Sequence, residues 1–284
     1  GPGQNVTYTV KYNAISKPRP LPTITEEQSQ TLTDINQTLK DRYCKGEGPW
    51  LTNNTLLMAL AHNLASHETR VLTIVKNFVG WIADNINYDS EEVPRYPNET
   101  VNGYGDCDDQ AILLITLCRI VGIPAYLQVG CIFQFGGFQS QTYWKDGLGR
   151  AHVTSVLRQI GWHGWAIVYI PPWGWLPADL TYVPIDPNLN DPLNAIRGAA
   201  VTGQDVIQYM NISRTDYVGA SRSLRDFVRN SDFFIYMEDE MEAHIDFENI
   251  LEFIKLVVVG ALVITGAISV SLATVFVYRW KKIR

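Results

Sequence analysis

An uncharged stretch near the C-terminal end constrains this chain more than any other feature of its sequence. Residues 256–278 form a run of 23 residues without a single charged side chain. As an α-helix this run would be about 34 Å long, enough to cross a hydrocarbon layer of roughly 30 Å. The alternative is a helix buried in a soluble core, but such helices seldom run so far without a charge. The sequence therefore predicts one transmembrane helix, which we place at residues 254–279.

The charges on the two sides of this run predict its orientation. A basic cluster, RWKKIR, follows the run at residues 279–284. Short flanks rich in Lys and Arg stay in the cytoplasm, so residues 280–284 are expected to be a cytoplasmic tail. Residues 1–254 carry 18 basic and 29 acidic side chains, a net charge of −11, and are expected outside the cell membrane. Such an acidic domain offers no basic face to a nucleic acid.

Several other features fit an extracytoplasmic glycoprotein. Five sequons for N-glycosylation precede the uncharged run, at Asn5, Asn36, Asn53, Asn98 and Asn211. Cys44, Cys118 and Cys131 could form a disulfide in an oxidising compartment, with the pairing left open. A glycosylated surface protein with a short basic tail would also suit an archaeal envelope.

Residues 256–278 also suggest what the chain contacts. The lipid bilayer is the expected partner of the whole run. Small residues such as Ala267 and Ser271 would let a second helix come close, so a partner helix or a homo-oligomer is a further expectation.

The pattern of apolar residues ahead of this run predicts an α+β domain, because helices come first and strands follow. Between 68 and 87 the apolar residues recur at three- and four-residue spacings, which predicts an amphipathic helix. We expect further helices at 26–44, 54–66, 107–121, 203–210 and 220–230, strands at 5–13, 125–135, 162–170 and 174–183, a turn region at 136–150, and an acidic stalk at 238–252.

Three side chains of this domain together suggest chemistry. Cys107 stands at the start of an apolar helix, where backbone N–H groups and the helix dipole should make its thiol ionise more readily than a buried one. His163 lies inside an aromatic strand, and Asp179 lies within a predicted strand where Asp is disfavoured unless it has a partner. Each residue alone is more often structural. Together they are the types needed for a thiol nucleophile, its base and an orienting acid.

The spacing of these residues is compatible with one site. The two strands that carry His163 and Asp179 are joined by a turn at Pro171 and Pro172. Residue 171 is the midpoint between the two side chains, so a simple hairpin register would pair them directly. The helix that begins at Cys107 then needs only to pack against that sheet.

Three motifs resemble the transglutaminase-like superfamily in order and spacing. The segment from residue 105, GDCDDQAILLITLCRIVGIPAY, is similar to the nucleophile segment of that family. The segments WHGWAIVYIP from residue 162 and GWLPADLT from residue 174 resemble its His and Asp strands. The match covers roughly residues 68–182, and Trp81 to Asp89 fit the helix that precedes the nucleophile.

The resemblance implies a papain-like core of N-terminal helices packed on an antiparallel sheet, with Cys107 as nucleophile, His163 as general base and then acid, and Asp179 as orienter of the imidazole. Two positions depart from the family pattern. Ile167 stands where an acidic residue is often found four positions after the His, and Leu180 replaces a Pro after the Asp. Neither change removes a member of the triad, so both bear on substrate choice or packing.

These features divide the chain into five parts. They are an N-terminal strand and helical extension (1–67), a transglutaminase-like core (68–182), a C-terminal extension with an acidic stalk (183–253), the membrane helix (254–279) and the basic tail (280–284).

The expected activity is acyl transfer on peptide or protein amide bonds through a thioester. Water as acceptor would make the chain a cysteine peptidase or amidase, which is the favoured reading. A lysine amine as acceptor would make it a cross-linking transglutaminase, and a non-catalytic envelope scaffold is the third alternative. No cofactor or metal is expected. Aromatic side chains around the site either wall the acyl group or pack as ordinary core residues: Trp162, Trp165, Trp173 and Trp175.

Overall fold

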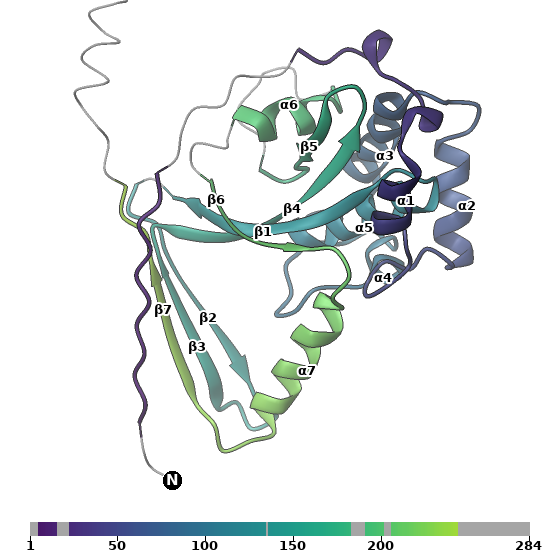
Figure 1. Ribbon diagram of the computed structural model, residues 1–284. Helices are drawn as coiled ribbons and strands as arrows, with labels where there is room; N and C mark the ends of the chain where they lie inside the picture. The colour runs from purple at the N-terminus through teal and green to yellow at the C-terminus, as the bar shows by residue number, and fades with distance from the viewer. Residues whose placement is uncertain (1–4, 16–22, 135, 183–190, 202–205, 244–284) are drawn as a thin grey trace, which may run out of the picture. The chain divides into compact units, whose positions relative to one another are not determined.

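The computed structural model describes residues 5–15, 23–134, 136–182, 191–201 and 206–243 (Figure 1). Residues 1–241 form one structural unit, separate from 242–284. The predicted membrane helix and basic tail lie outside the described residues. Within the described ranges, no helix combines the length and the apolar character needed to span a membrane.

The N-terminal part is helical, as the sequence predicts, but its first helix is broken up. Two short 3-10 turns, Glu26–Gln28 and Leu32–Asp34, replace most of the helix expected at 26–44. Asn36 ends this irregular region, because its side chain accepts a hydrogen bond from the Thr38 N–H and caps a new helix. The helices that follow are α1 Gln37–Tyr43, α2 Thr55–Leu64, α3 Val71–Asn85 and the single turn α4 Pro97–Thr100.

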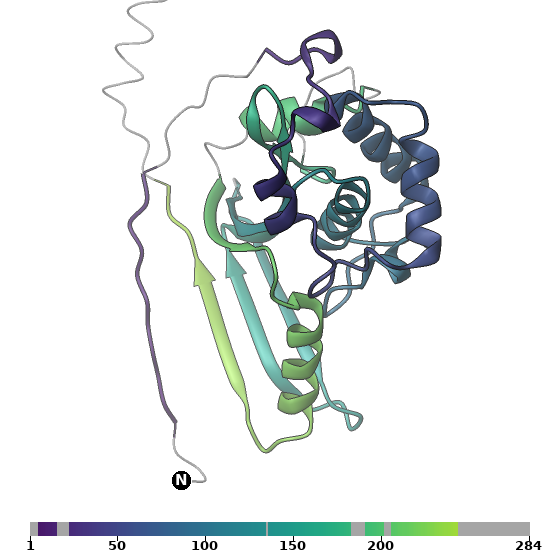
Figure 2. The ribbon, with the colours of Figure 1, turned by 45° about the vertical axis from the view of Figure 1, so that its right-hand side comes forward.

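Helix α5, Cys107–Ile120, is the centre of the domain. Asp106 caps it, and Asp109 returns the interaction in a capping box. All residues from Asp109 to Arg119 are buried, because α5 contacts α2, α3 and α4 as well as strands of the main sheet (Figures 1 and 2). This all-round burial explains why the sequence of α5 is apolar on every face.

Arg119 fastens the far end of α5. Its guanidinium donates to the carbonyl oxygens of Lys45 (2.9 Å), Ala125 (2.7 and 2.9 Å) and Ser213 (2.9 Å). The same group lies over the Trp50 ring at 4.4 Å. One buried side chain thus ties the end of α5 to the start of β1 and to two segments that are distant in sequence.

The main sheet has four antiparallel strands in the order β5-β4-β1-β6. The predicted strands at 125–135, 162–170 and 174–183 are confirmed, with shorter or shifted ends. The prediction of a helix at 203–210 is wrong, because residues from 206 onward form a strand that pairs with β1. Residues 5–13 form no strand. The strands are β1 Ala125–Phe133, β4 Ile160–Ile170, β5 Gly174–Ala178 and β6 Val206–Ile212.

A second sheet of three strands, in the order β2-β3-β7, stands beside the first. Its strands β3 and β7 run parallel, whereas the sequence predicts an antiparallel sheet. The predicted turn region contains β2, and the first part of the predicted acidic stalk is β7. The elements are β2 Gln139–Lys145, β3 Ala151–Arg158, β7 Ile235–Glu240, and the helices α6 Asn194–Val201 and α7 Tyr217–Arg229.

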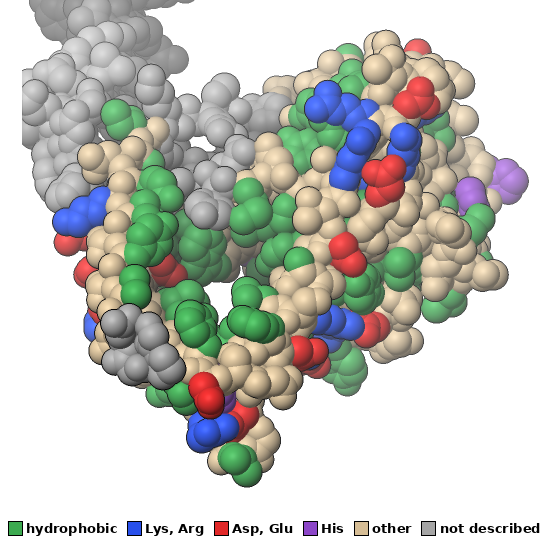
Figure 3. Space-filling view, turned by 60° about the horizontal axis from the view of Figure 1, so that its bottom comes forward, with side chains coloured by type: hydrophobic (Ala, Val, Ile, Leu, Met, Phe, Trp, Pro, Cys, Tyr) green, Lys and Arg blue, Asp and Glu red, His purple; other side chains and the backbone are tan. Residues whose placement is uncertain are grey.

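Helix α7 stands apart from the three-stranded sheet over much of its length. Figure 3 shows hydrophobic side chains around a hollow on this side of the molecule. The exposed apolar residues of α7 and β7 include Leu224, Phe227, Tyr236 and Met237. This part of the domain therefore buries less apolar surface than the region around α5.

Candidate active site

The first turn of α5 and the middle of β4 touch without an intervening side chain. A Cβ atom added to Gly164 would lie 2.7 Å from the Asp108 Cβ and 3.2 Å from the Asp108 Cα, so only glycine fits there. The Gly164 backbone N–H forms a hydrogen bond with Cys107. The predicted nucleophile therefore lies against the residue that follows His163.

His163 and Asp179 form a direct pair. His163 Nε2 lies 2.5 Å from Asp179 Oδ2, and both side chains are buried. The other carboxylate oxygen, Oδ1, accepts the backbone N–H groups of Thr181 and Tyr182, each at 3.0 Å. These two N–H groups fix the carboxylate, and the carboxylate in turn orients the ring.

This contact determines which ring nitrogen can act as a base. A carboxylate accepts hydrogen bonds, so the neutral His163 ring carries its proton on Nε2. Nδ1 then keeps its lone pair and can take a proton from a thiol. Strand β5 pairs with β4 only from Ala166 onward, so the edge of β4 next to His163 is not covered by β5.

The register between the two strands differs from the simple one expected. Trp175 lies opposite Tyr169, which centres the hairpin on residue 172 instead of 171. Asp179 falls just beyond the end of β5 and is therefore a diagonal neighbour of His163. The side chains still meet, because both point to the same face of the sheet.

The surroundings of Cys107 differ from the sequence expectation. Burial raises the pKa of the thiol, and the charges of Asp108 and Asp106 raise it further. Hydrogen bonds from the backbone N–H groups of Gly164 and Asp108 act in the opposite direction without offsetting these effects. The prediction of an easily ionised thiol is thus wrong for the resting chain, and a base must remove its proton.

The two acids share their own hydrogen bond. Burial raises the pKa of Asp106 to about 8, and the hydrogen bond to Asp108 and the charge of Asp108 add to this effect. Burial also raises the pKa of Asp108, which accepts hydrogen bonds from Asp106 and from the Tyr217 hydroxyl. At neutral pH the pair therefore retains a proton. The sequence showed the three clustered Asp residues, but nothing in it pointed to Tyr217.

The side chains of Asp106, Cys107 and Asp108 form the one cluster within the described residues that could hold a metal ion. Ligand atoms of Asp106, Cys107 and Asp108 lie within 4.8 Å of one another. A cation held there would bind the thiolate, so metal binding and nucleophilic attack by Cys107 would exclude each other.

Asp106→Asn should change how stability depends on pH. The native pKa of about 8 lies above the ordinary value of about 3.9, so native Asp106 keeps a proton that the unfolded chain has lost. The contribution of the Asp106 carboxyl to the stability of the folded chain is therefore fully present below pH 4 and is lost as the pH rises toward 8. Asn keeps the helix cap but has no proton to lose. Between pH 4 and pH 8.5, the free energy of unfolding of the variant should therefore rise by at least about 1.4 kcal/mol relative to that of the wild type.

Urea unfolding at both pH values measures this difference. Asp84→Asn, at an exposed position of α3, is the control and should follow the wild type. The same pH dependence in Asp106→Asn and the wild type would contradict the assignment.

Arg95 anchors the segment before the site to α5. Its side chain bonds Asp109 Oδ2 at 2.8 Å, while its backbone N–H bonds Asp109 Oδ1 at 2.6 Å. The guanidinium also reaches Asp89 Oδ2 at 2.6 Å and Glu91 at 2.8 Å. Nothing in the sequence predicts this network, because an Arg in a loop gives no sign that it will be buried.

Aromatic rings enclose the imidazole. Trp165 stacks on His163 with ring centroids 5.7 Å apart, and Tyr182 meets it edge-on at 5.9 Å. The other tryptophans behave differently. Trp175 packs among Tyr43, Tyr126 and Tyr169, and Trp173 packs against the core. Trp162 is 43% exposed, and its indole N–H donates to Asp239 at 3.1 Å.

The remaining predicted positions are not part of this site. Cys44, Cys118 and Cys131 are free thiols. Burial raises the pKa of both Cys44 and Cys131 to about 11. The asparagines of all five sequons are exposed, including Asn211, whose side chain also accepts a hydrogen bond from Gln128.

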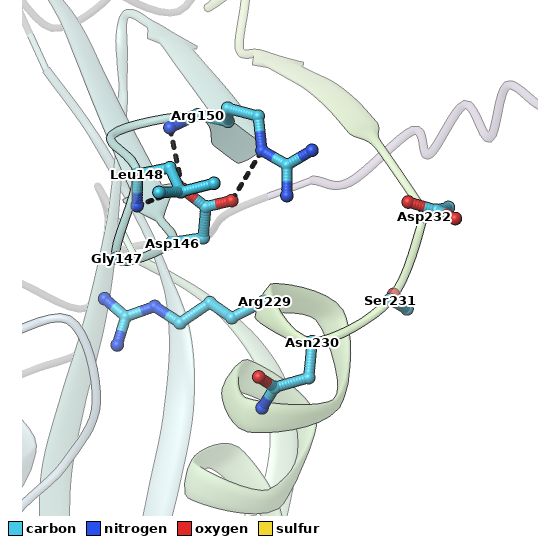
Figure 4. A pocket seen from close by; sticks show the side chains of 8 residues that line it. All are labelled: Asp146, Gly147, Leu148, Arg150, Arg229, Asn230, Ser231 and Asp232. Carbon is cyan, nitrogen blue, oxygen red and sulfur yellow. Dashed lines mark hydrogen bonds and ion pairs between the residues drawn. The ribbon is translucent and has the colours of Figure 1, made fainter.

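A separate polar pocket lies between the β2–β3 turn and the end of α7 (Figure 4). Its volume is about 320 Å³, and its lining includes Asp146, Arg150, Arg229 and Asp232. Asp146 accepts hydrogen bonds from the backbone N–H groups of Leu148 and Arg150, both at 2.9 Å. None of the three predicted catalytic residues lines this pocket.

Comparisons with known proteins give a family match and a similar solved structure for this chain. Residues 58–180 match the sequence profile of the Transglutaminase-like superfamily. One similar solved structure is named "Putative Cysteine Protease" and comes from Cytophaga hutchinsonii, with 21% sequence identity and a TM-score of 0.36. The similarity covers 66% of this chain and 58% of that one. No curated protein matches. The segment that carries Cys107, His163 and Asp179 is thus similar to the Transglutaminase-like superfamily.

Proposed function

We propose that this chain is an extracytoplasmic, membrane-anchored cysteine peptidase or amidase that cleaves peptide or protein amide bonds through a thioester. The observation that carries the proposal is the 2.5 Å contact between His163 and Asp179, together with the Gly164 N–H bonded to Cys107. These contacts support the proposal, because they pair His163 with Asp179 and hold the segment of Cys107 against the residue that follows His163. That combination has chemical use only if the thiol reacts.

The reaction follows from the protonation states. His163 Nδ1 takes the proton of the Cys107 thiol as the sulfur attacks the amide carbonyl carbon. The C–N bond then breaks, and the imidazolium returns its proton to the leaving amine. Water, activated by the same nitrogen, attacks the thioester and releases the acid and the free thiol. Asp179 keeps the ring in the required tautomer throughout.

The anchoring part of the proposal rests on sequence. The uncharged run 256–278 and the basic cluster after it support a single membrane crossing, with residues 1–254 outside and the C-terminus in the cytoplasm. Five exposed sequon asparagines fit this location.

Acylation of Cys107 tests the activity on the full chain in detergent. The probe 4-nitrophenyl acetate should transfer its acetyl group to Cys107, detected as a thioester by mass spectrometry. Cys107→Ala should release no 4-nitrophenolate above background, whereas Cys44→Ala should behave as the wild type. Adding a primary amine then separates transfer to water from transfer to the amine, which marks a cross-linking enzyme. A second arm adds protease to intact cells and should remove residues 1–254.

The proposal fails if Cys107 is acetylated no faster than Cys44. That result would favour the scaffold reading. Full protection of residues 1–254 from external protease would reverse the proposed topology without affecting the chemistry.

A further inference from the structure

His152 on β3 is fully buried and takes no part in the proposed reaction. Its ring Nδ1 lies 3.0 Å from the Phe233 carbonyl oxygen, in the loop between α7 and β7. Its Nε2 lies 3.2 Å from Asp146 Oδ2, in the turn between β2 and β3. The ring thus joins two segments that are far apart in the sequence.

Both oxygens that face the ring can only accept a hydrogen bond. The Phe233 carbonyl has no proton to give. Asp146 Oδ1 accepts the backbone N–H groups of Leu148 and Arg150, each at 2.9 Å, and Oδ2 accepts the Arg150 Nε–H at 2.7 Å. Desolvation works to raise the pKa of Asp146, but these hydrogen bonds outweigh it and hold the pKa well below its usual range. Asp146 is therefore a carboxylate.

A neutral imidazole cannot satisfy both oxygens. It carries one proton, so one of its nitrogens would present a lone pair to an oxygen 3.0 or 3.2 Å away. The imidazolium form has an N–H on each side and donates to both. Burying this charge is unfavourable, but the Asp146 carboxylate is its counterion, and Phe234 stacks on the ring with centroids 4.7 Å apart. The geometry therefore favours the charged ring.

Other charged side chains stand on the elements packed against His152, at the same end of the second sheet: Lys145 on β2, Arg150 in the turn, Arg229 at the end of α7 and Asp232 in the loop that follows. The last three also line the pocket in Figure 4. Within the described part of the chain, none of the four forms a hydrogen bond or an ion pair with the His152 ring. The acids of β7, residues 238–240, lie further along the sheet, opposite residues 156–158. The counterion of the ring is thus Asp146.

We propose that His152 is an imidazolium in the folded chain and acts as a pH-sensitive latch between the β2–β3 turn and the loop before β7. A ring that loses one proton keeps a single N–H, which stays with Asp146 because a charged acceptor forms the stronger bond. The contact to Phe233 then breaks, and the loop is released from β3. The same loop forms one side of the pocket in Figure 4, so its release opens that pocket.

The sign of the pH dependence follows from the proton count. An ordinary histidine releases its second proton at about pH 6.5. Below that pH the closed and the open latch both carry two protons, and closure is fully favourable. Above it the closed ring holds a proton that the open ring has lost, so closure weakens as the pH rises. The latch therefore closes in mildly acidic solution and opens in alkaline solution.

Nuclear magnetic resonance of the ring nitrogens tests the charge, on the full chain in detergent with 15N-labelled histidine. At pH 7.5 an ordinary histidine is largely neutral and has one unprotonated nitrogen. Both nitrogens of His152 should be protonated at that pH. His152→Gln identifies the signal by its loss, and if that variant does not fold, replacing the other histidines one at a time identifies it instead. A neutral His152 ring at pH 7.5 overturns the proposal.

Amide hydrogen exchange of the same chain tests the latch. From pH 6 to pH 8.5, after correction for the intrinsic effect of pH, residues 231–237 should exchange about tenfold faster, as expected for one lost hydrogen bond from a charged donor. Residues 112–117 of α5 are the internal control and should not change. In Asp146→Asn, which removes the counterion, the pH dependence should disappear, whereas Asp232→Asn in the same pocket should keep it.

Two results of the exchange experiment would contradict the latch. Equal exchange of residues 231–237 at both pH values in the wild type would mean that the ring does not fasten the loop. A pH dependence that survives in Asp146→Asn would assign the proton to another group. Neither measurement involves turnover by Cys107, so both outcomes leave the proposed function untouched.

Discussion

Asp179→Asn should lower kcat for acyl transfer about 10⁴-fold and leave the fold intact. The backbone N–H groups of Thr181 and Tyr182 both donate to Asp179 Oδ1, so the single oxygen of an Asn amide must take that place. The NH₂ group then faces His163 Nε2, which has to accept instead of donate. The ring proton moves to Nδ1, where it blocks removal of the thiol proton. A reversed tautomer of this kind costs on the order of 10⁴ in a catalytic triad.

Initial rates with 4-nitrophenyl acetate measure this loss, and circular dichroism checks the fold. Asp226→Asn on the exposed face of α7 is the control, because among the described residues its carboxylate contacts only the neighbouring Arg225. It should retain full activity. A loss of less than tenfold in Asp179→Asn would mean that the carboxylate does not set the tautomer of His163.

Arg95→Leu should destabilise the folded chain by about 3–5 kcal/mol, the usual cost of breaking a buried ion pair by removing one partner. Asp109 is only 1% exposed, and Arg95 provides two of its hydrogen bonds. The substitution leaves the backbone bond but removes the cation, so Asp109 would be a buried charge without a counterion. The loss also removes the hydrogen bonds that the guanidinium donates to Asp89.

Urea unfolding at pH 7 measures the change in the free energy of unfolding. Arg150→Leu is the control, because the Arg150 side chain is 54% exposed and its pair with Asp146 should contribute less than about 1 kcal/mol. The double variant Arg95→Leu/Asp109→Leu should recover much of the loss, since no charge is then left buried. A single-variant loss close to that of Arg150→Leu would show that the buried pair does not stabilise the domain.

The elements that carry the candidate site could be predicted because their signals are local. Helix α5 begins at an Asp with a second Asp three residues later, and an apolar run follows. Strands β4 and β5 are rich in aromatic and β-branched residues around a Pro-Pro turn. In each case the residues that define the element are neighbours in the sequence.

The second sheet could not be predicted, because its signals are not local. β7 pairs with β3 across about 80 residues, with Val153 opposite Ile235. The sequence IYMEDE of β7 is acidic and resembles a solvated stalk more than a strand. Its Glu238 is stabilised by Arg158 on the neighbouring strand, a contact that only the tertiary structure provides.

In the candidate site, too, some properties follow from the sequence and others depend on the tertiary structure. Residue types and order were enough to propose Cys107, His163 and Asp179 as a group. The acidity of the thiol was predicted wrongly, because it depends on the burial of the sulfur and on carboxyl groups around it.

The contact across Gly164 has a consequence for how the site can move. Cys107 and His163 come from segments 56 positions apart, yet main chain meets main chain between them. A contact of this kind contains no rotatable side chain that could act as a hinge. The main chain that carries the thiol and the main chain that carries the imidazole therefore cannot be parted by rearranging a side chain between them, and only a movement of α5 against β4 would separate them.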